Sequence, residues 1–202
     1  MLKKVLEYFH KRWYSIFRID DRRIRKSEVI SMEGIFDARS LACYIIDKYN
    51  KFTNGAKEIS NIKLQKALYF LLAYWGGFVR KGQMNDSEEK LEANAILFSN
   101  EIQAWVYGPV VPDVFHAKKD GILDNYKLED EKLREIFDSV PMLEETIDSL
   151  LGDIFPVADF KLVSTSHEDK SWINHFDMDD LFHNEPIPQE EIIQEYTLRD
   201  AI

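Results

Sequence analysis

The sequence contains little cysteine, few glycines and no long hydrophobic run. Its single cysteine, Cys43, excludes an internal disulfide, and the apolar residues around it at 41–46 predict a buried thiol. The eight glycines occur singly or as the pair Gly76-Gly77, so there is no glycine-rich phosphate loop. No segment approaches the roughly 20 continuous apolar residues of a membrane span, and residues 1–15 lack a secretory signal. These absences favour a cytoplasmic protein without a membrane span.

Motifs for metal binding and for nucleophilic catalysis are also missing. No two of the histidines His116, His167, His175 and His183 have the His-x-x-x-His spacing of a metal site, and residues 164–166 show no nucleophile-elbow pattern. The sequence therefore predicts no catalytic, cofactor-binding or metal-binding residue. A hydrolase that uses His167 with a neighbouring carboxylate ranks last among the functions considered. His167 is instead expected to begin a helix and to hydrogen-bond locally.

Charge is distributed unevenly along the chain. Residues 1–26 carry nine Lys/Arg and three acidic residues, which is about +6, whereas the remaining residues carry 17 basic and 33 acidic groups, which is -16. The main body is therefore expected to repel nucleic acid and to attract basic partners. The same negative surface also has a simpler interpretation, namely that it keeps the protein soluble.

The N-terminal part reads as an extension of the main domain. Apolar residues recur at helical spacing over 2–17, with lysines and a histidine on the other faces, and a charged connector follows at 22–26. Such a basic amphipathic segment could dock on the body, on a partner or on an anionic surface. We therefore divide the chain into an extension at 1–34 and one domain at 35–202.

The pattern of the main domain predicts a mainly α fold, a compact helical domain with a small β-hairpin. Caps and breakers predict a helix from Asp37 to about Lys48, a helix from Ser60 that Gly76-Gly77 ends, and a helix that opens at Pro112. Further helices are expected at 129–138, at 142–151, from a Ser166 cap near Glu168, and at 189–196. The apolar runs 95–98 and 102–106 are expected to form the hairpin around a link at 99–101.

Three segments carry a resemblance to a known family. They are Ile62-Lys63-Leu64-Gln65-Lys66-Ala67-Leu68-Tyr69-Phe70, Ala104-Trp105-Val106-Tyr107-Gly108-Pro109-Val110-Val111-Pro112-Asp113-Val114-Phe115, and Ser166-His167-Glu168-Asp169-Lys170-Ser171-Trp172. In order and spacing they resemble the Panacea domain of SocA-like antitoxins, over residues 36–197. The second segment is the most specific, and Phe115 departs from it by replacing an expected tyrosine.

The resemblance implies function as well as fold. Panacea proteins resemble antitoxins that are encoded beside their toxins and neutralise them by direct binding, and no cofactor is implied. For this chain it implies a partner toxin encoded nearby. Alternatives that it also implies are an adaptor that delivers the toxin to the ClpXP protease, and a phage-encoded host-interaction factor.

Several motif residues are candidates for contacting a partner. Trp105 and Tyr107 could be interface anchors or could pack in the core, and Lys63 and Lys66 could be polar contacts or a solvated face. Gln65 is expected to make a buried hydrogen bond. The complete candidate set is Lys63, Lys66, Trp105, Tyr107, Asp113, His167 and Trp172. Three residues have a structural role: Gly108-Pro109 is expected to form a sharp exit from the hairpin, and Pro112 to start the next helix.

Overall fold

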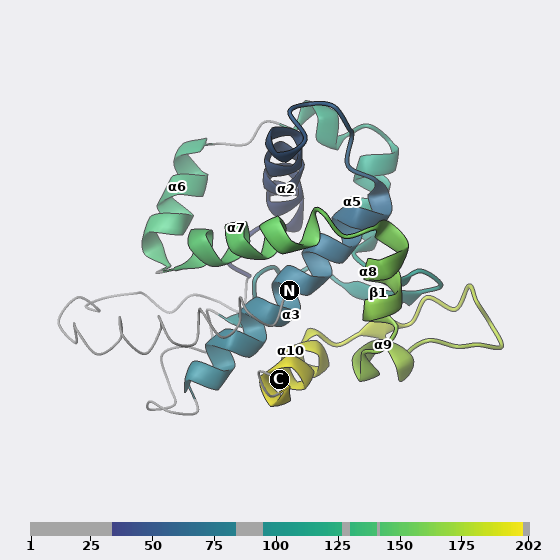
Figure 1. Cartoon of the computed structure of the whole chain (residues 1–202). Coiled ribbons are helices and arrows are strands. Elements are labelled where there is room, and N and C mark those ends of the chain that lie inside the picture. Colours follow the sequence, from purple (N-terminus) through teal and green to yellow (C-terminus); the bar gives the residue numbers. More distant parts are fainter. Residues whose placement is uncertain (1–33, 84–94, 127–129, 141, 200–202) are drawn as a thin grey trace.

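The predicted fold class is confirmed: helices dominate, with one small antiparallel sheet. The computed structural model describes residues 34–83, 95–126, 130–140 and 142–199 (Figure 1). The predicted extension therefore lies outside the described residues except for Gly34, and so does Pro141. The elements are α2 (Ala38–Phe52), α3 (Asn61–Gln83), β1 (Ile102–Trp105), β2 (Gly108–Val110), α5 (Pro112–Lys119), the 3-10 helix η1 (Leu123–Asn125), α6 (Asp130–Ser139), α7 (Leu143–Ile154), α8 (Asp159–Ser166), α9 (Lys170–Ile173), β3 (Pro186–Ile187) and α10 (Gln189–Leu198).

Local capping explains where several helices begin. The carboxylate of Asp37 accepts a hydrogen bond from the Ser40 backbone N–H at 3.0 Å, and Ser60 Oγ accepts one from the Lys63 N–H at 3.0 Å. Each bond satisfies a backbone donor of the first turn that has no partner within the helix. Pro112 occupies the first position of α5, where its missing N–H costs nothing. These three predicted starts are confirmed.

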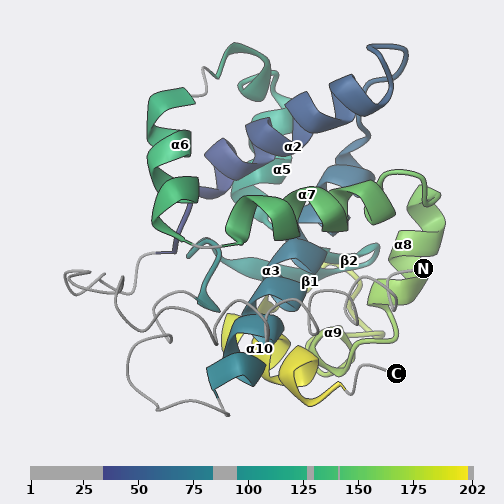
Figure 2. The same cartoon turned by 60° about the vertical axis from the view of Figure 1, so that its left-hand side comes forward.

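Helix α3 runs through the middle of the molecule, with α2 and α7 on one side and α10 on the other (Figures 1 and 2). The predicted end at Gly76-Gly77 is wrong, because α3 continues to Gln83. A Cβ on Gly76 would lie 2.6 Å from Ile193 Cγ1, and one on Gly77 would lie 2.8 Å from the backbone of Tyr196. The two glycines therefore serve close packing of α10 against α3.

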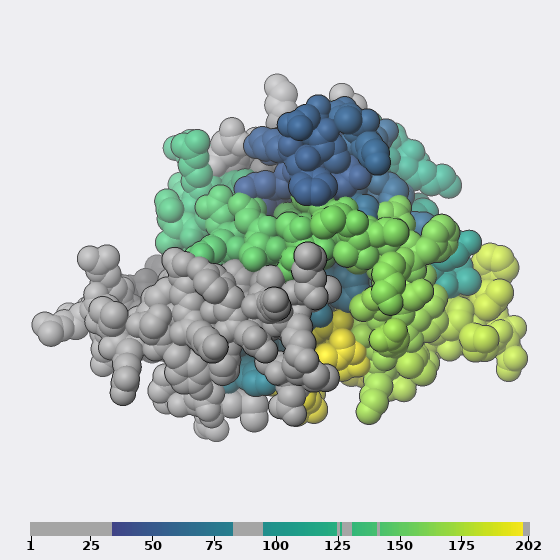
Figure 3. Space-filling view, in the orientation of Figure 1, coloured from purple at the N-terminus to yellow at the C-terminus, as the bar shows by residue number. Residues whose placement is uncertain are grey.

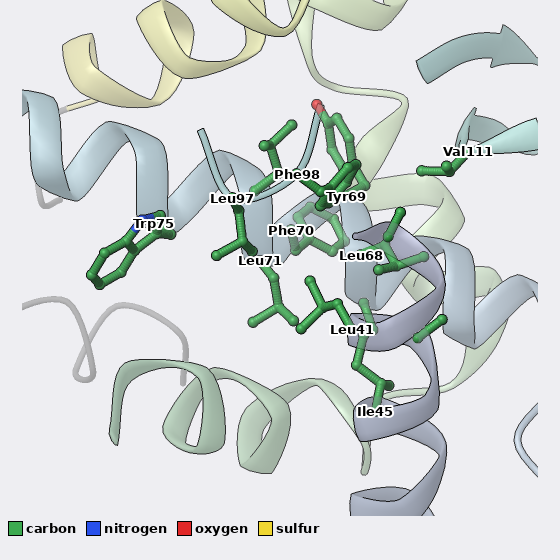
Figure 4. Packing of buried hydrophobic residues seen from close by; sticks show 14 of the residues in the cluster. Leu41, Ile45, Leu68, Tyr69, Phe70, Leu71, Trp75, Leu97, Phe98 and Val111 are labelled. Carbon is green, nitrogen blue, oxygen red and sulfur yellow. The ribbon is translucent and has the colours of Figure 1, made fainter. Parts of the chain in front are cut away.

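The hydrophobic core surrounds α3. Figure 4 shows Leu41 and Ile45 of α2 facing Leu68 and Leu71 of α3, all four of them fully buried. Leu97, Phe98 and Val111 belong to the same core. In Figure 3, α7 covers the middle of one face in green below α2. Cys43 is buried as predicted, and burial raises the pKa of its thiol to about 11. None of the helices described here is long and apolar enough to cross a membrane.

One of the two predicted strands is confirmed: the run at 102–106 contains β1, but its hairpin partner is β2 and not the run at 95–98. Strand β1 pairs with β2 through a turn at 106–107, with Trp105 opposite Gly108, and β3 pairs with the other edge of β1. Residues 95–98 are not a strand; Phe98 makes one parallel bridge to Phe36 and is buried in the core. Gly108 and Pro109 therefore lie within β2 and do not form an exit from the hairpin.

The region before the third motif contains a helix that the sequence did not indicate. Helix α8 ends at Ser166, whose Oγ donates to Val163 O at 2.9 Å, so the prediction that Ser166 caps the next helix is wrong. Helix α9 begins at Lys170 after Asp169. Glu195 of α10 takes the capping role, accepting hydrogen bonds from the Lys170 and Ser171 N–H groups at 2.9 Å each.

Candidate functional site

The three motif segments meet at the hairpin, around the end of β1 and around β2. Lys66 Nζ donates to Pro109 O at 2.8 Å, and Gln65 Oε1 accepts from the Val111 N–H at 2.8 Å. From the other side, Trp172 Nε1 donates to Trp105 O at 3.0 Å. Each bond joins a side chain of one motif to the backbone of the hairpin segment. The predicted buried bond of Gln65 is confirmed, although its Nε2 has no hydrogen-bond partner within the described residues.

Gly108 is held between the first and third motifs. Its φ of +88° is a backbone conformation that glycine adopts far more readily than other residues. A Cβ here would lie 2.9 Å from Lys66 Nζ and would collide with Ser166 Oγ. Glycine is therefore required here for two reasons: the backbone conformation disfavours other residues, and a side chain would not fit.

The two candidate lysines were predicted to lie on the surface, but both are buried. Lys63 is 6% exposed and donates to Val157 O, with Asp159 Oδ1 at 3.2 Å. Lys66 is 1% exposed, and burial lowers its pKa to about 7, against the opposing charge of Asp169. Both lysines donate to backbone carbonyls inside the protein. These carbonyls, of Val157 and Pro109, belong to segments far from the lysines in the sequence.

The burial of Lys66 predicts a pH-dependent stability. Its pKa of about 7 in the folded chain is below the ordinary value of 10.5, so above pH 7 the unfolded chain binds more protons than the folded chain. The free energy of unfolding is therefore expected to rise from pH 7 to 8.5, by at most about 1.4 kcal/mol per pH unit. In Lys66→Met this contribution should be absent. Urea titrations of both proteins across this range measure the difference, and parallel pH curves would contradict the assignment.

Asp169 of the third motif is the centre of a buried polar cluster that sequence reasoning missed. It is 0% exposed and accepts from Tyr69 OH at 2.5 Å, from Tyr196 OH at 2.9 Å and from Arg199 Nη2 at 2.5 Å. Burial raises the pKa of Asp169, and the bonds from Tyr69 and Arg199 oppose that rise. Arg199 also contacts Glu195 at 2.8 Å. This cluster joins α3, α9 and α10.

His167 lies in a stack of aromatic rings. Its ring is 3.9 Å from that of Trp172 at an interplanar angle of 8°, and Trp172 in turn stacks on Phe176 at 4.5 Å. The prediction that His167 begins a helix and bonds locally is wrong: it follows the end of α8, and its Nε2 is buried without a partner within the described residues. Burial and the charge of Lys66 lower its pKa.

The remaining candidates divide between buried and exposed positions. Trp172 is 7% exposed. Trp105 is half-buried, and its ring lies 4.9 Å from that of Phe115. Phe115, which stands where the family resemblance leads us to expect a tyrosine, therefore still makes a packing contact. Asp113 of α5 forms a partly exposed bidentate ion pair with Arg39, with Nε to Oδ2 at 2.8 Å.

Tyr107 is the one candidate whose side chain is mostly exposed in the described structure. It is 53% exposed in the hairpin turn beside Val106, and its ring lies 6.2 Å from that of Phe160, which is 66% exposed at the start of α8. Val106, Tyr107 and Phe160 form what we term the hairpin-tip surface. Tyrosine and other aromatic side chains presented in this way are typical anchors of protein interfaces.

Other chemistry has little support in the described geometry. Within residues 34–83, 95–126, 130–140 and 142–199, no group of three or more His, Cys, Asp or Glu side chains is placed to hold a metal ion. A shallow groove of about 670 Å³ between α9 and α10 is lined by charged residues, including Glu168, Glu191 and Arg199. Comparison with known proteins found no matching family model, no matching curated protein and no matching solved structure.

Proposed function

We propose that this chain is a cytoplasmic antitoxin of the Panacea-like kind, which neutralises a toxin encoded by a neighbouring gene by binding it directly. The observation that carries the proposal is the contrast between buried polar side chains and one exposed aromatic side chain in the three motifs. Lys66, Gln65 and Asp169 use their side chains in buried internal bonds, whereas Tyr107 is presented to solvent beside Phe160. A packed core that presents an exposed aromatic tip suits binding better than catalysis.

Charge supports the same proposal. The chain outside residues 1–26 carries a formal charge of -16. A toxin that acts on RNA or on nucleotides needs a basic surface to attract its substrate. An acidic inhibitor would be attracted to that surface, which speeds encounter, while aromatic anchors that become buried on binding set the residence time.

The test begins with co-expression. The neighbouring gene is expected to stop growth when expressed alone, to allow growth when this chain is present, and to yield a complex of fixed stoichiometry on size-exclusion chromatography. A neighbour that is harmless alone, or that forms no complex, would remove the antitoxin proposal. Capture of a protease subunit in its place would favour the adaptor function.

The hairpin-tip surface gives this proposal a residue-level prediction. Replacing Tyr107 and Phe160 together by alanine is expected to weaken toxin binding by about 30-fold or more, the effect of losing a hot spot. Because both side chains are more than half exposed, the thermal midpoint should change little. Calorimetric titration of the purified toxin measures the affinity. Ile122→Ala, at an apolar residue 46% exposed outside the hairpin-tip surface, is the matched control.

A further inference from the structure

A loop between α9 and β3 is held closed at its base. Phe176 and Asn184 form an antiparallel bridge, so the ends of the segment 177–183 lie side by side. Just outside them, His175 Nδ1 lies 2.9 Å from Glu185 and its Nε2 lies 3.0 Å from Glu191 of α10. Burial lowers the pKa of His175, but the two carboxylates raise it by more. We call residues 177–183 the acidic loop; it projects at the right-hand edge of Figure 1.

The acidic loop exposes three large apolar side chains within five residues. Phe182 is 89% exposed, Met178 is 76% exposed and Leu181 is 46% exposed. Within the part of the chain that the structure describes, Phe182 is the most exposed of the large hydrophobic residues. Such side chains contribute nothing to the core, and clustered exposed apolar groups mark interaction sites.

Carboxylates alternate with these apolar groups and order the loop. Asp177 Oδ1 accepts from the Asp179 N–H at 2.8 Å, and Asp180 Oδ1 accepts from the Phe182 N–H at 3.1 Å. No lysine or arginine occurs between residues 174 and 185. The turns hold the apolar side chains outward before binding, which lowers the entropy cost of docking. The negative charge disfavours an anionic membrane or a nucleic acid as the partner.

The register of the sheet places the acidic loop at the same end as the hairpin-tip surface. Gln103 pairs with Pro186, and Ala104 N–H donates to Glu185 O at 2.8 Å. Because the strands are antiparallel, the chain preceding β3 lies beside the Trp105 end of β1, where the turn at 106–107 begins. One partner can therefore contact both surfaces.

We propose that the acidic loop docks Phe182 and Met178 into an apolar pocket ringed by lysine or arginine side chains on the partner protein. This inference rests on the proposed function, because the partner is the toxin bound by the hairpin-tip surface. The aromatic and thioether groups fill the pocket, and Asp177, Asp179 and Asp180 face its basic rim. The acidic loop thus adds a second contact whose chemistry specifies the partner.

Binding of the purified neighbouring-gene toxin to variants of the full chain tests the proposal. Met178→Ser with Phe182→Ser is expected to weaken binding by about 30-fold or more. Asp177→Asn with Asp179→Asn and Asp180→Asn keeps the acceptor oxygens of the turns. It is expected to weaken binding by about 3- to 10-fold at low salt and to flatten the salt dependence. Ile122→Ser is the control for an exposed apolar residue elsewhere.

The outcomes separate the two proposals. If the Tyr107 and Phe160 variant loses affinity while both loop variants bind within twofold of the original chain, the loop inference is overturned and the proposed function stands. If the original chain binds no toxin, both are overturned. A photo-crosslinker at position 182 adds a direct readout. Cross-linking to an apolar pocket flanked by Lys or Arg on the toxin supports the inference, and cross-linking to an acidic or flat polar surface refutes it.

Discussion

Gly108→Ala is expected to lower the free energy of unfolding by about 2–5 kcal/mol. A left-handed backbone costs an alanine roughly 1–2 kcal/mol, and overpacking a filled site costs a further 1–3 kcal/mol or so. The new methyl group would meet Lys66 Nζ at 2.9 Å and Ser166 Oγ closer still, at a site where both partners are buried. Equilibrium urea unfolding followed by tryptophan fluorescence measures the loss.

Two comparisons separate the conformational and steric contributions at Gly108. Gly55 has a similar φ of +72° with nothing within 4 Å of the position that a methyl group would take, so Gly55→Ala should lose only the conformational part, about 1–2 kcal/mol. Adding Ser166→Ala to Gly108→Ala removes the closest atom and should restore part of the stability. Equal losses for Gly108→Ala and Gly55→Ala would show that the contact with Ser166 and Lys66 carries no cost.

Asp169→Ala is expected to destabilise the domain by about 3 kcal/mol or more, the cost of breaking a buried ion pair. The substitution leaves the buried hydroxyls of Tyr69 and Tyr196 without their shared acceptor, and each unsatisfied group adds to the cost. Arg199 keeps Glu195 as a partner, which holds the loss near the lower end of the range. Urea unfolding again gives the value.

Neighbouring variants control for charge and for shape at Asp169. Glu168→Ala removes an adjacent, exposed carboxylate and should change stability by no more than about 0.5 kcal/mol. Asp169→Asn keeps one acceptor oxygen in place and should lose less than Asp169→Ala. If the Glu168 and Asp169 variants to alanine were equally stable, the buried cluster would not contribute to the fold.

Local chemistry explains which elements were predictable. The starts at Asp37, Ser60 and Pro112 depend on bonds or dihedrals within one turn, and the structure has all three. The end predicted at Gly76-Gly77 failed because those glycines face α10, which is distant in sequence. Helix α8 was missed because its sequence DFKLVSTS is rich in β-branched and hydroxyl residues with low helix propensity.

The candidate site was less predictable than the fold. Lys66 can be buried because the Pro109 carbonyl accepts its hydrogen bond. Asp169 can be buried because Tyr196 and Arg199 donate to it. No periodicity in the sequence links residues so far apart, so lysines on a helix read as surface residues. The presence of the three motifs together was the one indication that they meet. The exposure of Tyr107 follows from its place in the turn that joins β1 to β2, a turn that the sequence pattern did not predict.

The packing of α10 against the glycine pair of α3 also bears on synthesis of the protein. The ribosome completes α3 before Ile193 and Tyr196 emerge, so the side of α3 that α10 covers stays uncovered until α10 has been synthesised. Asp169 likewise acquires Tyr196 and Arg199 only when α10 arrives. A nascent or truncated chain that lacks α10 therefore presents the kind of surface that chaperones and quality-control proteases bind. Helix α10 thus makes survival of the chain depend on translation having continued through α10.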